Sequence, residues 1–309
     1  MAAIEISSLT KWYGRMRGIE DVTFSVGRGE VFGYLGPNGS GKTTTIRCLM
    51  GLLRPSRGGV YILGERVMPG RGTQHARIGY LPGDFRAWGR AKGLRMLELL
   101  ASLGGGAGVA ARRRELADRL DLDLGRAVGD LSKGNRQKVA LIAAFQHQPD
   151  VLVLDEPTAG LDPLLRQTAW DLIREAAGGG AAILLSSHDL GEVAAVCGRA
   201  AILREGRLVE NAPIDRIVQQ GEHRLKVWFR DGNLVGELSA AHLPGVRIVE
   251  RGPGMLHLAY QGTADALLKW VAQFPVERIA TPQTSLEEAF IQYYRPSNAD
   301  SAAAKGVRP

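Results

Sequence analysis

Apolar and polar positions alternate along the first 35 residues of the chain. Short alternating runs occupy residues 4–6 and 22–26, and a more apolar run, 31–36, ends in a glycine-rich segment. Alternation with a period of two is typical of half-buried strands. Between Lys42 and Leu53 the apolar residues recur at helical spacing until Arg54 and Pro55 interrupt the pattern. The sequence therefore predicts a strand, a loop and a helix in succession.

The pattern becomes helical between Ala91 and Arg126, where leucines recur at positions 94, 97, 100 and 103. This spacing predicts a small helical subdomain over about residues 84–135. From Val151 onward strands and helices alternate: strand 151–155, helix 164–177, strand 181–188 and helix 190–197. Such alternation is typical of a parallel α/β sheet that is covered on both faces.

A different pattern follows residue 200. A hairpin is predicted over residues 200–210, turning at Glu205 and Gly206, and a helical run ends at Gly221. We place a domain boundary there, which gives a first domain at 1–220 and an accessory α+β domain at 221–295. The elements expected beyond it are strands 225–229, 246–250, 255–260 and 276–281, and helices 264–274 and 285–295. Residues 296–309 read as a disordered tail.

Composition adds few constraints. The chain has 309 residues, 45% hydrophobic and 23% charged, which is ordinary for a globular protein. Apolar stretches such as 139–145 are far shorter than the roughly 20 residues that span a bilayer, and the N-terminus lacks the pattern of a secretory signal. Cys48 and Cys197 stand alone, which supports neither a disulfide nor a zinc site. We therefore expect a protein of the cytoplasm without a membrane span.

The net charge of +7 suits nucleic acid, an anionic membrane surface or phosphate ligands, and does not choose among them. The basic run at residues 112–114 has no interleaved aromatic residues, so we interpret it as a solvated helix face.

A glycine-rich motif provides the first chemistry. The segment GPNGSGKT matches GxxxxGK[ST] and lies between the predicted strand and helix. Its glycines allow backbone N–H groups to converge on a phosphate, while Lys42 supplies positive charge and Thr43 a hydroxyl for Mg²⁺. The predicted nucleotide-binding residues are Gly36, Pro37, Asn38, Gly39, Ser40, Gly41, Lys42, Thr43 and Thr44.

A second motif, VLVLDEP at residues 151–157, is a buried strand that ends in two carboxylates. Beside a phosphate loop, Asp155 is placed as a Mg²⁺ ligand. Glu156 can face the water that attacks the γ phosphate and accept its proton. The pair would be an ordinary acidic strand end without the preceding phosphate loop.

The segment LSKGNRQK at 131–138 resembles the signature motif of ABC transporter ATPases, with Lys133 and Asn135 departing from its commonest form. The resemblance covers about residues 4–220. It implies an α/β phosphate-loop NTPase core of the ABC ATPase type, with an antiparallel β subdomain and a helical subdomain. It also implies a homodimer around two Mg-ATP, in which Ser132 and Gly134 bind the γ phosphate held by the other subunit at a helix N-terminus.

The same resemblance assigns further residues. Asp162 resembles the acid of the loop that crosses the dimer interface, and His188 resembles the switch histidine that contacts the γ phosphate. Tyr13 matches the aromatic residue that stacks on adenine, with Trp12 as its rival. Where the family usually has a glutamine that contacts Mg²⁺ and the attacking water, this chain has Gly83 followed by Asp84. Our hypothesis is that the oxygen atoms of Asp84 replace that amide directly or through water.

The run TSLEEAF at 284–290 resembles the terminal segment of bacterial drug-exporter ATPases, which pair with separate membrane subunits. The predicted function is ATP hydrolysis that drives export of a hydrophobic or amphipathic compound, from the cytoplasmic face of the membrane. An ABC ATPase for another substrate, such as a lipid, polysaccharide or ion, or an importer, is an alternative. A soluble ABC ATPase acting on nucleic acid or ribosomes is opposed by the single set of motifs and the absence of heptad repeats.

Overall fold

The computed structural model describes residues 2–70, 75–85, 89–103, 108–219, 222–232, 234–240 and 243–281. The chain separates into two compact units, Met1–Asn211 and Ala212–Pro309. The division falls before the helical run that ends near residue 220, whereas the sequence places it after that run. The helix predicted at 285–295 and the tail at 296–309 lie outside the described residues.

The first unit is built on a six-stranded sheet with the order β10-β9-β3-β8-β7-β6. Strands β9, β3, β8, β7 and β6 run parallel to one another, and the parallel α/β sheet expected from the sequence is present. Their positions are buried almost throughout because layers cover both faces of the sheet. The strands are β3 (Val31–Leu35), β6 (Ile78–Leu81), β7 (Val151–Asp155), β8 (Ala182–Ser187), β9 (Arg199–Arg204) and β10 (Arg207–Pro213).

The hairpin that joins β9 to β10 turns at the predicted residues. Glu205 and Gly206 have φ angles of 49° and 82°. Two successive positive φ angles are the requirement of the type I′ turn, whose twist matches that of the flanking strands.

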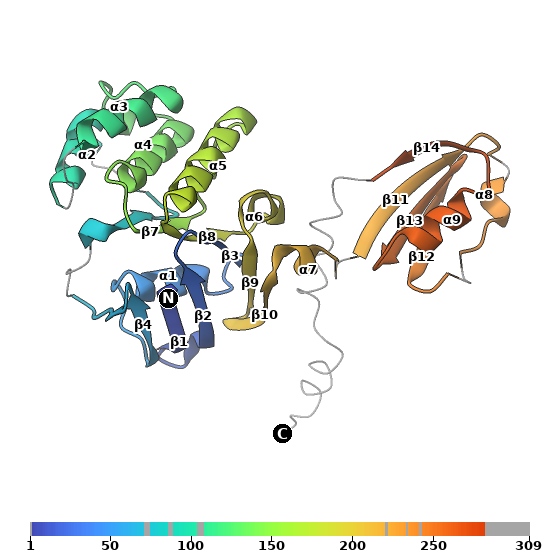
Figure 1. Ribbon diagram of the computed structural model, residues 1–309, viewed down its shortest axis with the longest axis horizontal. Helices are drawn as coiled ribbons and strands as arrows, with labels where there is room; N and C mark the ends of the chain where they lie inside the picture. The colour runs from blue at the N-terminus through green and yellow to red at the C-terminus, as the bar shows by residue number, and fades with distance from the viewer. Residues whose placement is uncertain are drawn as a thin grey trace. The chain divides into compact units, whose positions relative to one another are not determined.

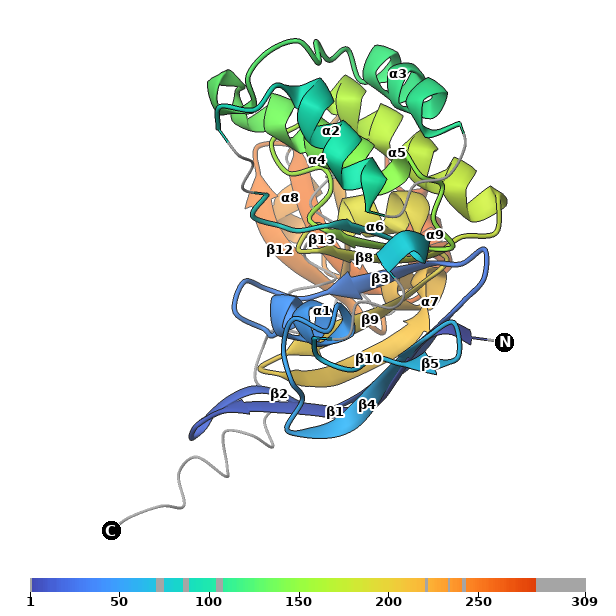
Figure 2. The same ribbon diagram turned by 90° about the vertical axis from the view of Figure 1, so that its left-hand side faces the viewer.

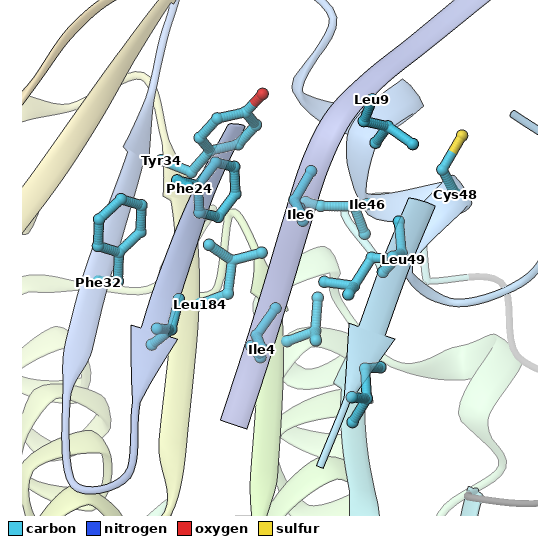
Figure 3. Packing of buried hydrophobic residues seen from close by; sticks show 14 of the residues in the cluster. Ile4, Ile6, Leu9, Phe24, Phe32, Tyr34, Ile46, Cys48, Leu49 and Leu184 are labelled. Carbon is cyan, nitrogen blue, oxygen red and sulfur yellow. The ribbon is translucent and has the colours of Figure 1, made fainter. Parts of the chain in front are cut away.

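An antiparallel sheet with the order β2-β1-β4-β5 forms the second layer. Its strands are β1 (Ala2–Tyr13), β2 (Met16–Gly27), β4 (Arg57–Ile62) and β5 (Glu65–Arg66). Helix α1 (Lys42–Leu49) lies between the two sheets and contacts both (Figure 2). Ile46 and Leu49 of α1 pack against Ile4 and Ile6 of β1 in the buried cluster of Figure 3. This core fixes the helix whose first residue is the lysine of the glycine-rich motif.

A helical layer covers the opposite face of the six-stranded sheet (Figure 1). It contains α2 (Gly93–Ser102), α3 (Val109–Arg119), α4 (Lys133–Phe145), α5 (Pro163–Gly178) and α6 (Leu190–Val196). Helix α4 contacts α2, α3 and strand β6. None of the described helices is long and apolar enough to cross a bilayer.

The leucine spacing predicts a helix here, and α2 is present. Its buried side chains include Met96 and Leu97, whereas Leu94 and Leu103 are exposed. One prediction for this layer is corrected. In α3 the basic run is not uniformly solvated. Arg113 is buried, and its Nε donates a hydrogen bond of 2.8 Å to the side-chain oxygen of Gln146.

The second unit is a four-stranded antiparallel sheet with the order β12-β13-β11-β14. Leu225, Val227 and Phe229 alternate inward along β11 and pack with Leu267 and Trp270 of α9. This arrangement confirms the predicted small α+β architecture. The elements are α7 (Ile214–Gln219), β11 (Glu222–Phe229), α8 (Leu234–Glu237), β12 (Val246–Gly252), β13 (Met255–Gln261), α9 (Asp265–Val271) and β14 (Val276–Ala280).

Candidate nucleotide-hydrolysis site

An open cleft of about 820 Å³ lies at the carboxyl ends of β3, β6 and β7. Its walls come from the loop after β3, the first turn of α1, the turn between β1 and β2, and the segments that follow β6 and β7. In parallel α/β sheets, the carboxyl ends of the strands are where loops converge to bind ligands. The two sequence motifs, far apart in the chain, meet here.

The glycine-rich loop connects β3 to the N-terminus of α1. Gly41 has a φ of +109°, and a Cβ atom there would lie 2.6 Å from Ile19 and 2.8 Å from the carbonyl oxygen of Gly18. Only glycine fits this close approach. Helix α1 begins directly afterwards at Lys42, so its free N–H groups and the positive end of its dipole face the cleft.

Lys42 is the buried cation of the cleft. Its Nζ donates to the carbonyl oxygens of Gly36 and Pro37, at 2.5 and 3.4 Å, and lies 3.8 Å from the Glu156 carboxylate. Burial lowers the pKa of this ammonium group, and the nearby carboxylates of Glu156 and Asp155 oppose that shift. The ammonium can exchange its backbone acceptors for phosphate oxygens.

Asp155 ends β7 and is 4% exposed. Its Oδ2 accepts from the hydroxyl of Thr43 at 3.5 Å, and its Oδ1 accepts from the hydroxyl of Ser186. A hydroxyl and a carboxylate beside a phosphate site are the hard oxygen donors that Mg²⁺ takes, the phosphates of the substrate completing its shell. The donor set therefore fits this metal.

Glu156 follows in a left-handed backbone conformation, with a φ of +53°. This conformation costs a non-glycine residue about 1 kcal/mol or more and persists only where neighbours impose it. One carboxylate oxygen lies 2.7 Å from Nδ1 of His188, and the other faces Lys42. The structure thus brings the predicted base and the predicted switch histidine into direct contact at the edge of the cleft.

Gly83 and Asp84 both line the cleft. Gly83 lies directly against Asp155, since a Cβ atom at position 83 would be 3.1 Å from Oδ2 of that carboxylate. Asp84 is exposed. The segment after β6 therefore approaches the Asp155 carboxylate with its backbone at Gly83. The side chain with oxygen atoms, that of Asp84, belongs to the next residue.

Tyr13 lines the cleft, whereas Trp12 is not among the described residues that do. The Tyr13 ring is 43% exposed, and its hydroxyl lies 3.4 Å from that of Thr44. The lining side chains that the sequence did not predict include Arg17, Arg47 and Tyr80. Burial and the nearby Asp155 carboxylate raise the pKa of Tyr80 to about 12. No motif marks these residues, because strand pairing and helix packing bring them to the cleft.

Ser132, Gly134 and Asp162 are not among the described residues that line this cleft. Ser132 is the N-cap of α4, and its hydroxyl oxygen accepts the N–H of Asn135 at 3.2 Å. Asp162 caps α5 in the same way by accepting the N–H of Leu165 at 2.9 Å. Both side chains therefore stabilise helix starts.

These features together define an ATP-hydrolysing cassette. They are a phosphate loop, an acidic strand end with an adjoining histidine, and a capped signature helix. A family model described as ABC transporter matches residues 19–159. The chain belongs to the ATP-binding subunits of ABC transporters, and it is an ATPase whose hydrolysis of ATP serves transport.

Similarity to two individual relatives extends over 94% of the chain. The daunorubicin resistance ATP-binding protein DrrA3 of Streptomyces coeruleorubidus is 35% identical, over 94% of this chain and 95% of the relative. The bacitracin transport ATP-binding protein BcrA of Bacillus licheniformis is 28% identical, over 94% of this chain and 96% of the relative. A solved ATP-binding subunit of an ABC transporter is 33% identical with a TM-score of 0.67, covering 71% of this chain and 92% of the other.

Proposed function

We propose that two copies of this chain close around two ATP molecules with Mg²⁺. Each ATP is bound between the cleft of one copy and the Ser132–Gly134 motif of the other. The observation that carries this proposal is the separation of the two sets of residues. Lys42, Asp155 and Glu156 border the cleft, while the signature motif is not among its described lining residues. A second copy would supply the missing donors to the γ phosphate.

The chemistry of hydrolysis is assigned to side chains that meet at the cleft. Glu156 takes a proton from water while the water oxygen bonds to the γ phosphorus and the bond to the ADP oxygen breaks. His188, 2.7 Å from Glu156, orients the carboxylate and can donate to the γ phosphate. Thr43 and Asp155 would hold Mg²⁺, which supplies charge neutralisation between the phosphates. Lys42 stabilises the negative charge that develops on the leaving group.

The transported cargo is proposed to be a hydrophobic or amphipathic compound, exported through a separate membrane protein from the cytoplasmic face. The support is similarity over nearly the whole chain, second unit included, to subunits for daunorubicin resistance and bacitracin transport. Closure of the dimer on ATP and its release after hydrolysis would provide the mechanical step.

The dimer is tested with Glu156→Gln, which keeps the shape of the side chain and removes its basicity. In sedimentation experiments this variant should dimerise with ATP and not with ADP. Adding Ser132→Arg, which places a bulky cation at the proposed contact, should abolish the dimer. The melting temperature of each variant, measured without nucleotide, checks folding. A Glu156→Gln chain that stays monomeric at saturating ATP would contradict the proposal.

The transport role is tested by isolating the tagged chain from membranes of its native host and identifying what accompanies it. A stoichiometric protein with several apolar spans supports export. Nuclease-sensitive RNA in its place supports the alternative of an ATPase acting on nucleic acid. Host cells carrying Lys42→Ala should then accumulate an amphipathic drug that wild-type cells expel; equal accumulation would contradict drug export and leave a lipid, polysaccharide or ion as cargo.

A further inference from the structure

Gln137 connects the signature helix to the turn that carries the candidate base. It lies in the second turn of α4 and is 8% exposed. Its Nε2 donates to the carbonyl oxygen of Glu156 at 3.1 Å and to that of Pro157 at 2.9 Å. An amide nitrogen carries two hydrogens, so each carbonyl can receive one. The side chain therefore donates hydrogen bonds to two successive peptide groups.

Backbone hydrogen bonds also hold this turn, because the Ala159 N–H donates to the Glu156 carbonyl oxygen at 3.2 Å. Glu156 has a φ of +53°, and its N–H donates to the carbonyl of Ser186 at 3.0 Å. Pro157 has no N–H, so its peptide group can accept but cannot donate a backbone hydrogen bond. The direction of the Glu156 side chain follows from this backbone, because the Cα–Cβ bond rotates with it. Holding the carbonyls on one side and the N–H on the other fixes where the carboxylate points.

A second contact joins the same two segments closer to the signature motif. A Cβ atom on Gly134 would lie only 2.8 Å from the carbonyl oxygen of Gly160. The first turn of α4 and the loop that leads from Glu156 to Asp162 are thus packed without room for even a methyl group. Close-packed segments of this kind move together. A displacement of the signature motif would be transmitted to the loop at Gly160 and to the turn at Glu156.

We propose that Gln137 is a positioning residue that couples the Ser132–Gly134 motif to Glu156 of the same chain. This inference rests on the proposed dimer. When the motif engages the γ phosphate bound by the second copy, α4 is held, and Gln137 sets the carboxylate over the first copy's own ATP. Each site then becomes competent only when the opposite site is occupied, and hydrolysis depends cooperatively on ATP concentration.

The test compares two buried glutamines of one helix. Gln137→Met keeps the volume and the helix propensity but cannot donate. The control is Gln146→Met, at the C-cap of α4, whose amide donates to the Leu97 carbonyl at 3.1 Å and accepts from Arg113. Each variant is made in the full chain and assayed for kcat, the KM for ATP, the Hill coefficient and melting temperature.

Gln137→Met should lower kcat about tenfold or more, since two hydrogen bonds to the turn are lost. Its KM should stay within about threefold because the phosphate loop is untouched. Its Hill coefficient should fall towards one. Gln146→Met should lower the melting temperature and leave kcat and the Hill coefficient at wild-type values. The inference is overturned if Gln137→Met keeps the wild-type kcat and Hill coefficient, or if Gln146→Met reduces them equally.

Failure of the coupling is distinguishable from failure of the dimer. Gln137→Met is also combined with Glu156→Gln and tested for dimerisation with ATP. A dimer in the double variant, together with the kcat loss in the single variant, supports positioning. If Glu156→Gln alone fails to dimerise, the proposed function falls and the coupling falls with it. If it dimerises while Gln137→Met turns over normally, only the coupling is wrong.

Discussion

A buried carboxylate behind the site gives a quantitative prediction. Glu192, on α6, is 3% exposed. Its two oxygens accept from the hydroxyls of Thr158 at 2.7 Å and Ser187 at 2.6 Å. Thr158 follows the Glu156 turn, and Ser187 precedes His188. Burial raises the pKa of Glu192, and the two hydroxyl groups oppose this shift. The Glu192 carboxylate thus joins the segments that carry Glu156 and His188, although its burial disfavours the charged form.

The magnitude follows from what each substitution removes. Glu192→Ala leaves two buried hydroxyls without their acceptor. A hydrogen bond to a charged group contributes about 1.5 to 3 kcal/mol, and relief of the buried charge offsets part of the loss. We expect a net loss of about 2 to 4 kcal/mol in the free energy of unfolding at pH 7. Glu192→Gln keeps an oxygen for Thr158 and offers N–H to the Ser187 hydroxyl oxygen, so its loss should stay near or below about 1 kcal/mol.

The pH dependence has a defined sign. Because the folded pKa of Glu192 is raised, the native state binds more protons than the unfolded state at pH values between the two pKa values. The stabilising contribution is present below the unfolded value and is lost as pH rises through the folded one. Glu192→Gln cannot titrate. Urea unfolding from about pH 5 to pH 8 should therefore show wild type losing stability relative to this variant as pH rises.

Two results would refute this reasoning. A stability difference between wild type and Glu192→Gln that is constant across the pH range would mean that the carboxylate titrates alike in both states. A glutamine variant as unstable as Glu192→Ala would mean that the charge itself, rather than hydrogen bonding, holds Thr158 and Ser187 together.

Three other predictions concern the core and the cleft. Gly79→Ala would place a Cβ atom against the Ala144 carbonyl of α4, and should lower stability by about 1 to 3 kcal/mol in urea unfolding; an unchanged midpoint would contradict this. Tyr13→Ala should raise the KM for ATP about fivefold or more with kcat retained, whereas Trp12→Ala should not, and the reverse ranking would favour Trp12 as the stacking residue. Asp84→Ala should lower the ATPase rate and raise the Mg²⁺ concentration needed for half-maximal activity; an unchanged titration would dismiss the Asp84 hypothesis.

Local patterns predicted the site better than they predicted its surroundings. The phosphate loop is recognisable because its glycines, Lys42 and Thr43 act within eight consecutive residues between a strand and a helix. The same holds for the carboxylates at the end of β7. In the sheet β8 separates β3 from β7, and because the three strands are parallel both motifs lie at the same edge. The two motifs and the fold class were therefore available from sequence.

Contacts between residues far apart in the chain could not be predicted from the sequence. The buried state of Arg113 depends on Gln146, 33 positions along the chain, and a run of three arginines gives no sign of it. The burial of Met96 and the exposure of Leu94 depend on where α4 crosses α2. The hydrogen bonds from Gln137 to the Glu156 turn likewise span about 20 positions. Side-chain pairing across helices follows from packing geometry, which one sequence does not reveal.

Gly83 occupies the position where the family usually has a glutamine. The resemblance of the sequence to ABC ATPases leads us to expect a glutamine here, and the structure shows what Gly83 approaches instead. A Cβ atom at position 83 would lie 3.1 Å from the oxygen of Asp155 that also faces Thr43. A side chain at this position would press on the carboxylate that we propose as a Mg²⁺ ligand, whereas glycine leaves room for its contact with Thr43. Asp84, the next residue, also lines the cleft, and we propose that its carboxylate supplies the oxygen that a glutamine would have offered.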